Sequence, residues 1–165
     1  IIMLTGQRVE EIARLHVDQW DAKERIIDWT KTKNLQPHAV PVPLLAAELI
    51  ESIIPNEHGW FFPSAKDPSK PVSHGTLYSF IWRQRDRGVI PHATNRDLRR
   101  TFKTLAGKAG VPKEIRDRLQ NHALQDVSSK HYDRWNYMVE KRAGMAKWDK
   151  FVRAMLAKKR MKAAA

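Results

Sequence analysis

Apolar residues recur with a helical period along most of the chain. In residues 7–16, Val9, Ile12 and Leu15 fall on one side of a predicted helix, and charged residues fall on the others. The apolar start, residues 1–5, is expected to be the last turn of a buried helix or strand. The same pattern predicts further helices over residues 44–54, 73–87, 97–109, 112–119, 126–135 and 138–157.

Three short runs of β-forming residues lie near the start of the chain. They cover residues 17–20, 26–30 and 39–42, and polar turns separate them. Short neighbouring strands joined by short turns favour an antiparallel meander. The sequence therefore predicts a mainly α-helical domain with a small antiparallel β-sheet near its N-terminus, an α+β fold.

Capping residues mark several expected helix ends. Ser73 is a predicted N-cap of a helix that stops at Gly88. Asp97 is a predicted N-cap of the next helix, which ends at Gly110. Pro112 suits the first turn of the helix that follows, because a proline there gives up an N–H that has no partner in any case.

The length and composition predict one folded domain. A chain of 165 residues, 42% hydrophobic and with six tryptophans, can build a proper core. We expect this domain to cover residues 1–157 and the basic, alanine-rich tail, 158–165, to fray. The first residue is not Met, and the chain opens inside an apolar element, so we expect a piece of a longer protein whose N-terminal domains are absent.

Charge is the composition feature that says most about partners. The formal net charge is +12, which favours a polyanionic partner such as DNA, RNA or an acidic membrane surface. The absence of cysteine excludes thiol nucleophiles, disulfides and cysteine-based zinc sites. No apolar run approaches the roughly 20 residues of a transmembrane helix, so no membrane-spanning segment is expected, and of the polyanions a nucleic acid is predicted rather than a membrane. No acidic cluster indicates a two-metal nuclease site, and no metal is predicted.

Several residues could have catalytic roles, although each of them taken alone also fits a structural or surface role. Arg8 suits a helix surface, His122 a helix end and Tyr132 the edge of a core. Lysines are the default residues of turns such as the one that holds Lys31 and Lys33. Consecutive arginines on a helix, at positions 99 and 100, project about 100 degrees apart, so only one can share a given pocket. The order of all these residues along the chain favours a shared functional site over a set of unrelated surface residues.

That order resembles the tyrosine recombinase, or phage integrase, family over residues 5 to about 148. The matching motifs are Thr5-Gly6-Gln7-Arg8, Thr30-Lys31-Thr32-Lys33 before Ala39-Val40-Pro41, Asp97-Leu98-Arg99-Arg100-Thr101, Leu119-Gln120-Asn121-His122 and His131-Tyr132-Asp133-Arg134. The resemblance implies the fold of the tyrosine recombinase catalytic domain. It implies Tyr132 as nucleophile, with Arg8, Arg99 and His122 as catalytic partners. It also implies a catalytic lysine on a β-hairpin, for which counting back from Pro41 favours Lys33 over Lys31.

The resemblance also assigns supporting residues. Glu11 matches an acidic residue that supports the first arginine, and Arg100 and Lys103 are expected DNA contacts. One position departs from the family pattern: Arg96 stands where a histidine three positions before the second arginine is usual. An arginine stays protonated and cannot act as a base, although it can bind phosphate. His92 and His131 are candidate substitutes for that histidine.

The resemblance implies site-specific recombination for integrating or excising a mobile element. DNA would be cut and rejoined through a covalent 3′-phosphotyrosine, without metal, ATP or other cofactor. The implied partners are double-stranded DNA at att-type sites, a homotetramer of the longer protein and accessory DNA-bending proteins, all in the cytoplasm. Two alternatives stay open: a non-catalytic DNA-binding remnant of a decayed integrase, and a type IB topoisomerase-like strand transferase. Tyr137 is the rival nucleophile to Tyr132.

Overall fold

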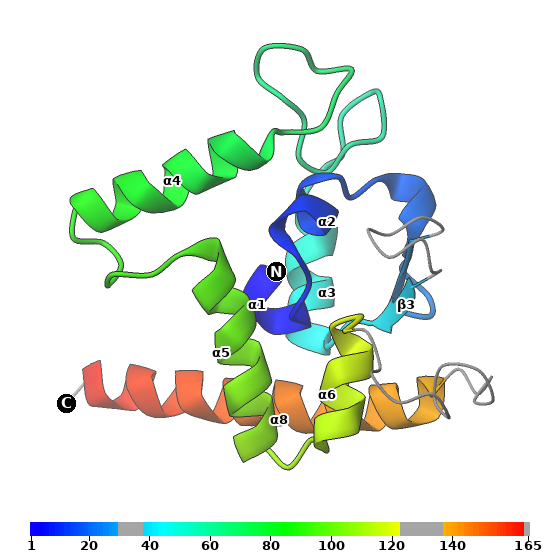
Figure 1. Ribbon diagram of the computed structural model, residues 1–165, viewed down its shortest axis with the longest axis vertical. Helices are drawn as coiled ribbons and strands as arrows, with labels where there is room; N and C mark the ends of the chain where they lie inside the picture. Colours follow the sequence, from blue (N-terminus) through cyan, green and yellow to red (C-terminus); the bar gives the residue numbers. More distant parts are fainter. Residues whose placement is uncertain (30–37, 123–136, 164–165) are drawn as a thin grey trace.

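The computed structural model describes residues 1–29, 38–122 and 137–163, and it is mostly helical with one small sheet (Figure 1). The predicted α+β class is therefore confirmed. In chain order the elements are α1 (Ile2–Thr5), α2 (Val9–Ala13), the 3₁₀ helix η1 (Val17–Gln19), β1 (Trp20–Asp21), β2 (Ile26–Trp29), β3 (His38–Pro41), α3 (Leu44–Glu51), α4 (His74–Asp86), α5 (Asn95–Lys108), α6 (Lys113–Leu119) and α8 (Met138–Ala163).

The sheet is a three-stranded antiparallel meander in the order β1-β2-β3, as predicted. Ile26 pairs with Pro41 and Trp29 pairs with His38. The first predicted strand, 17–20, is wrong for its first three residues, which form η1. The reason is local: the His16 ring accepts the Asp18 N–H, and the Gln19 side chain accepts the His16 N–H, which closes a 3₁₀ turn.

Helix boundaries differ from prediction where capping side chains compete. The N-cap of α5 is Thr94, not Asp97, because Thr94 Oγ1 accepts the Asp97 N–H and Asp97 Oδ2 accepts the Thr94 N–H. The predicted Ser73 cap of α4 is confirmed by its bond from the Thr76 N–H at 3.1 Å. Pro112 is the N-cap of α6 and lies just before its first turn. The predicted helix over 126–135 lies outside the described residues.

Two other helices have unexpected lengths. The first predicted helix, 7–16, shrinks to α2 at Val9–Ala13, since residue 6 and Arg8 adopt non-helical conformations before it. The last helix, α8, continues to Ala163 instead of ending at 157. Its last turns consist of alanine, lysine, arginine and methionine, which are strong helix formers, so the helix persists although the side chains of residues 154–161 are exposed.

Residues from α1, near the start of the chain, and from α8, at its end, pack together in the core with α5. Phe102 of α5 is fully buried and meets the Trp148 ring of α8 edge to face, with ring centroids 5.6 Å apart. The Trp148 indole N–H donates to the Leu4 carbonyl at 2.8 Å, which attaches α1 to the same centre. Leu98, predicted to share the buried face with Phe102, is only half-buried. This packing holds the segment after α1 against α5.

Helix α4 differs from the other described α-helices because none of its residues is buried. It projects from the body of the molecule and meets α2 near its own beginning (Figure 1). Tyr78, Phe80 and Trp82 are each about half exposed. Among the described helices, none combines the length and the apolar character that a membrane-spanning segment requires.

Candidate active site

A basic cavity of about 750 Å³ opens between α2, α4, the start of α5 and the C-terminal end of α6. Among the described residues, its lining includes five arginines and lysines, two histidines and a single carboxylate, that of Glu10, so the cavity suits an anion. The lining residues are Gln7, Arg8, Val9, Glu10, His74, Tyr78, Thr94, Asn95, Arg96, Arg99, Arg100, Lys103, Gln120 and His122.

Gly6 forms the tight turn that brings α1 and α2 to the cavity. Its φ of +72° is a conformation that side chains with a Cβ disfavour. A Cβ at this position would also lie 2.3 Å from a ring carbon of the buried Phe102. The Gly6 carbonyl accepts hydrogen bonds from Arg99 Nη1 at 2.9 Å and from Gln120 Nε2 at 3.3 Å. The glycine therefore allows a close backbone approach that orients two other site residues.

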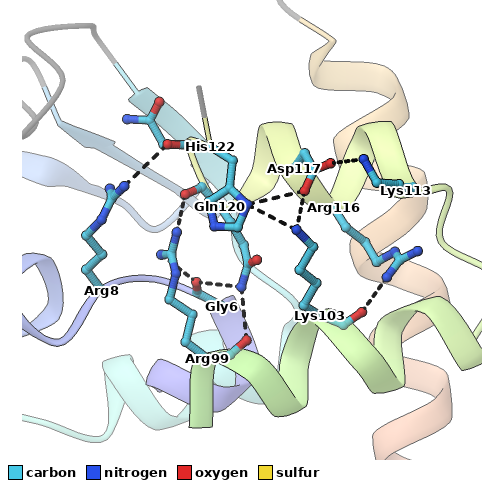
Figure 2. Close-up of polar contacts among 10 residues, drawn as sticks. Gly6, Arg8, Arg99, Lys103, Lys113, Arg116, Asp117, Gln120 and His122 are labelled. Atoms are coloured by element: carbon cyan, nitrogen blue, oxygen red, sulfur yellow. Dashed lines mark hydrogen bonds and ion pairs between the residues drawn. The ribbon is translucent and has the colours of Figure 1, made fainter. Parts of the chain in front are cut away.

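Arg8 lies two residues later, at the N-cap of α2, and Glu11 holds it in place. Glu11 accepts the Arg8 backbone N–H at 2.8 Å and Arg8 Nη1 at 2.9 Å. The two side chains are mostly buried, with 22% and 11% of their surfaces exposed. Arg8 Nη2 reaches the carbonyl of Asn121 at 3.4 Å. Glu11 thus restricts the guanidinium to one orientation, facing the end of α6 (Figure 2).

Arg99 approaches the same place from α5. Its guanidinium donates to the carbonyl of Gly6, in the turn after α1, and to the carbonyl of Gln120, at the end of α6. Burial, and then the nearby charge of Arg8, lowers the pKa of Arg99 to about 10. The group remains charged at neutral pH, but two partly desolvated guanidiniums lie close together. An anion in the cavity would relieve this repulsion.

His122 reaches the cavity because α6 ends in a specific motif. Asn121 adopts a left-handed conformation with φ of +48°, which asparagine tolerates better than most residues. The His122 N–H then donates to the Asp117 carbonyl, and the Asn121 N–H donates to the Arg118 carbonyl. This is the Schellman pattern of helix ends. It turns the chain back so that the imidazole lies beside α5.

The Asp117 carboxylate binds two lysines next to the His122 ring. It accepts hydrogen bonds from Lys103 Nζ at 2.5 Å and from Lys113 Nζ at 3.0 Å. Its Oδ1 also lies 3.3 Å from His122 Nδ1 (Figure 2). Burial opposes ionisation, but the hydrogen bonds from both lysines outweigh it and lower the pKa of Asp117 to about 2. Burial, with the charges of Lys103 and Arg99, lowers the pKa of His122, so the imidazole is neutral at pH 7.

Two glutamines complete the framework. Gln120 Nε2 donates to the carbonyls of Gly6 and Arg99, so one amide connects the turn, α5 and the end of α6. The side chain of Gln7 is fully buried and donates to the Leu119 carbonyl at 2.8 Å. Sequence reasoning placed Gln7 and Gln120 inside motifs without giving them roles, and it missed Asp117. Only the position of Asp117, five residues before His122 and on the helix that leads to it, could have indicated it.

The structure brings part of the predicted catalytic set together. Arg8, Arg99 and His122 line one cavity. The other lining residues that the sequence singled out are Arg96, Arg100 and Lys103. Glu11 supports Arg8, as the family pattern implies. Arg96 and Arg100 are exposed at the rim, and Arg100 lies 3.5 Å from Asp97.

The remaining predicted site residues are not among the described lining of the cavity. Lys31, Lys33, His131 and Tyr132 lie outside the described residues. Tyr137, the rival nucleophile, is half-buried just before α8, and the Arg118 guanidinium lies 3.4 Å from its ring centre. Tyr137 is absent from the described lining of the cavity. In the described part of the chain, no group of three or more histidines and carboxylates is placed to hold a metal ion.

Sequence comparison finds relatives among integrases. The family model described as the phage integrase family matches residues 1–137. The chain is 28% identical over 144 residues to prophage integrase IntF of Escherichia coli K12, covering 81% of this chain and 29% of IntF. It is 26% identical over 156 residues to prophage integrase IntA of the same organism, covering 92% of this chain and 37% of IntA. The chain thus spans about a third of each relative.

Solved structures share the fold. The integrase from mycobacterium phage Brujita matches with a TM-score of 0.71 at 20% identity, over 90% of this chain and 49% of that one. The Tn1549 transposon integrase, solved in complex with circular intermediate DNA, matches with a TM-score of 0.61 at 16% identity, over 88% of this chain and 55% of that one. At these identities the likeness shows the fold. Since the family model covers most of the sequence, the chain belongs to the phage integrase family, of the tyrosine recombinase type.

Proposed function

We propose that this chain is the catalytic domain of a site-specific recombinase that cuts and rejoins double-stranded DNA at att-type sites of a mobile element. One observation carries the proposal: Arg8, Arg99 and His122, from three separate segments, converge on one basic cavity in a member of the integrase family. The Tn1549 integrase was solved with DNA, which supports DNA as the ligand of this cavity.

In this proposal the cavity binds the phosphate that is cut. Arg8 and Arg99 contact its non-bridging oxygens and stabilise the negative charge that develops on them. His122 contributes a neutral hydrogen-bond donor. Arg96 and Arg100 at the rim contact phosphates of the flanking backbone. Arg96 is assigned a phosphate contact rather than a proton transfer, because its guanidinium stays protonated.

Tyr132 and Lys33 complete the reaction, and their roles rest on the motifs that contain them. The phenolate oxygen of Tyr132 bonds to phosphorus while the bond to the 5′ oxygen breaks, and Lys33 protonates that leaving oxygen. Free tyrosine has a pKa near 10, so only about 0.1% is phenolate at neutral pH; nearby guanidiniums favour the anion. The 3′-phosphotyrosine stores the bond energy, and a second 5′-hydroxyl can reverse the step without ATP.

The proposed assembly is a homotetramer of the longer protein on two synapsed sites, with accessory DNA-bending proteins as further partners. The net charge of +12 supports a large contribution of phosphate contacts to the free energy of DNA binding. Binding should therefore weaken steeply with salt. A flat response between about 50 and 200 mM salt would count against DNA as the partner.

The test of catalysis uses a nicked duplex that carries the attachment site, so that the cut strand loses its end and the covalent complex accumulates. The proposal expects a protein–DNA adduct that survives denaturation. The competing function, a DNA-binding remnant, is favoured by Arg96 in the place of the usual histidine. It predicts salt-sensitive binding with no adduct, and that result would reject the proposed enzyme.

A further inference from the structure

Lys103 lies one helical turn after Arg99 on α5, but its side chain turns toward His122. Its Nζ is 2.5 Å from Asp117 Oδ1 and 3.1 Å from His122 Nδ1 (Figure 2). About a third of the side chain is exposed. The ammonium group is therefore held in a fixed position against one particular ring nitrogen.

The chemistry of the two groups restricts the proton on the imidazole. A lysine ammonium has three donors and no acceptor, whereas a neutral imidazole has one donor nitrogen and one acceptor nitrogen. An N–H on Nδ1 would point at the ammonium and repel it. With its lone pair on Nδ1, the ring accepts from Lys103 and carries its proton on Nε2.

Asp117 is the competitor for the same nitrogen. Its Oδ1 lies 3.3 Å from Nδ1 and alone would favour a proton there. That oxygen already accepts from Lys103 at 2.5 Å, and Oδ2 accepts from Lys113 at 3.0 Å. The shorter contact to the imidazole comes from the donor, Lys103. Asp117 therefore acts on the histidine mainly by holding the lysine.

We propose that Lys103 is a positioning residue that selects the Nε2–H tautomer of His122. This tautomer leaves an N–H donor free of the Lys103–Asp117 pair. The further step, in which this N–H donates a hydrogen bond to a DNA phosphate, rests on the proposed function. The tautomer itself is a property of the protein without DNA, so the two ideas can fail separately.

The test is ¹⁵N NMR of the histidine side chains in the 165-residue chain at pH 8, with His122→Gln to identify the His122 signals. The expected wild-type ring has an unprotonated Nδ1 and a protonated Nε2. Lys103→Met leaves Asp117 as the neighbour of Nδ1 and should shift the tautomer ratio toward Nδ1–H by roughly tenfold or more. Lys103→Arg, which keeps the donors, should retain the wild-type tautomer.

Lys108→Met is the matched control, since Lys108 is exposed at the end of the same helix and should leave the His122 signals unchanged. A protonated Nδ1 in the wild type would overturn the proposal, even if Lys103→Met failed to fold. An unchanged tautomer in folded Lys103→Met would overturn it as well. A confirmed tautomer in a chain that forms no DNA adduct would reject the proposed function alone.

Discussion

Gln7 and His38 are 31 residues apart and share a buried hydrogen bond of 3.1 Å between Gln7 Oε1 and His38 Nε2. The amide nitrogen of Gln7 donates to the carbonyls of Thr5 and Leu119, both at 2.8 Å, so the amide oxygen must face the histidine. His38 Nε2 therefore carries a proton. One side chain thus joins the turn before Arg8, the strand β3 and the end of α6.

Replacement of this amide should destabilise the fold. Gln7→Leu removes the hydrogen bonds that Gln7 makes with two buried carbonyls and with the His38 N–H, and each such group left unsatisfied costs about 1–3 kcal/mol. We expect the free energy of unfolding to fall by roughly 3 kcal/mol or more in urea titrations. Gln84→Leu, on the projecting α4, is the control and should change the value by less than about 1 kcal/mol. Equal losses in both variants would contradict the role given to Gln7.

His38 should make stability depend on pH. Burial, and then the charge of Lys141, lowers the pKa of His38 to about 3, well below its ordinary value of 6.5. The unfolded state therefore binds a proton more readily, so stability rises with pH between these values and falls on acidification. From pH 7 to pH 5 this group alone removes about 2 kcal/mol. The lowered pKa of His122 acts in the same direction.

Urea titrations at pH 7 and pH 5 measure this dependence. Carboxylates whose pKa values lie at 4 or below stay largely ionised over that range, which separates their effect from that of the histidines. His38→Gln keeps an amide donor for Gln7 and removes the titrating ring, so the loss between the two pH values should shrink by about 2 kcal/mol. An unchanged loss would show that His38 is not the group that titrates.

Gly6 offers a matched pair of substitutions. Gly6→Ala imposes a left-handed backbone on alanine and places its Cβ 2.3 Å from the Phe102 ring. Gly88→Ala imposes the same kind of backbone, with φ of +67°, but its Cβ meets nothing within 4 Å. Both should lose about 1–2 kcal/mol to the backbone, and Gly6→Ala should lose at least another 1–3 kcal/mol to the clash. Equal thermal stabilities would contradict the close packing of Gly6 on Phe102.

The arginines of the cavity should be needed for strand cleavage. Arg8→Gln and Arg99→Gln each remove a cation that the proposal places on the phosphate, and each should slow adduct formation on the order of a hundredfold. Arg14→Gln is the control, because Arg14 is exposed at the end of α2, away from the described lining of the cavity. Gel assays of adduct against time measure the rates. A comparable loss in Arg14→Gln would indicate a general effect of charge instead.

The order of motifs in the sequence was enough to predict the fold class and to bring Arg8, Arg99 and His122 into one hypothesis. The meander and most helices follow from periodicity and turn residues. The cap of α5 was misplaced because Thr94 and Asp97 are both good caps, and only their reciprocal hydrogen bonds decide between them.

The supporting residues could not be predicted, because their partners are distant in sequence. Gln7 meets Leu119 across 112 residues, and nothing local in Thr5-Gly6-Gln7-Arg8 marks the glutamine as buried. In the sequence, Asp117 stands between two arginines on a helix, and nothing nearby marks it as a site residue. Its role depends on Lys103 arriving from α5, which is a consequence of how α5 and α6 pack.

The identity of the tyrosine that carries the DNA tests the central claim most directly. Trypsin separates the two candidates, because cleavage after Lys130 and Arg134 leaves Tyr132 in His131-Tyr132-Asp133-Arg134, while Tyr137 falls in the next peptide. Digestion of the covalent adduct and mass spectrometry should find the nucleotide on the Tyr132 peptide. Tyr132→Phe should form no adduct, and Tyr137→Phe should form it normally. A nucleotide on the Tyr137 peptide, or an adduct that persists in Tyr132→Phe, would contradict the account.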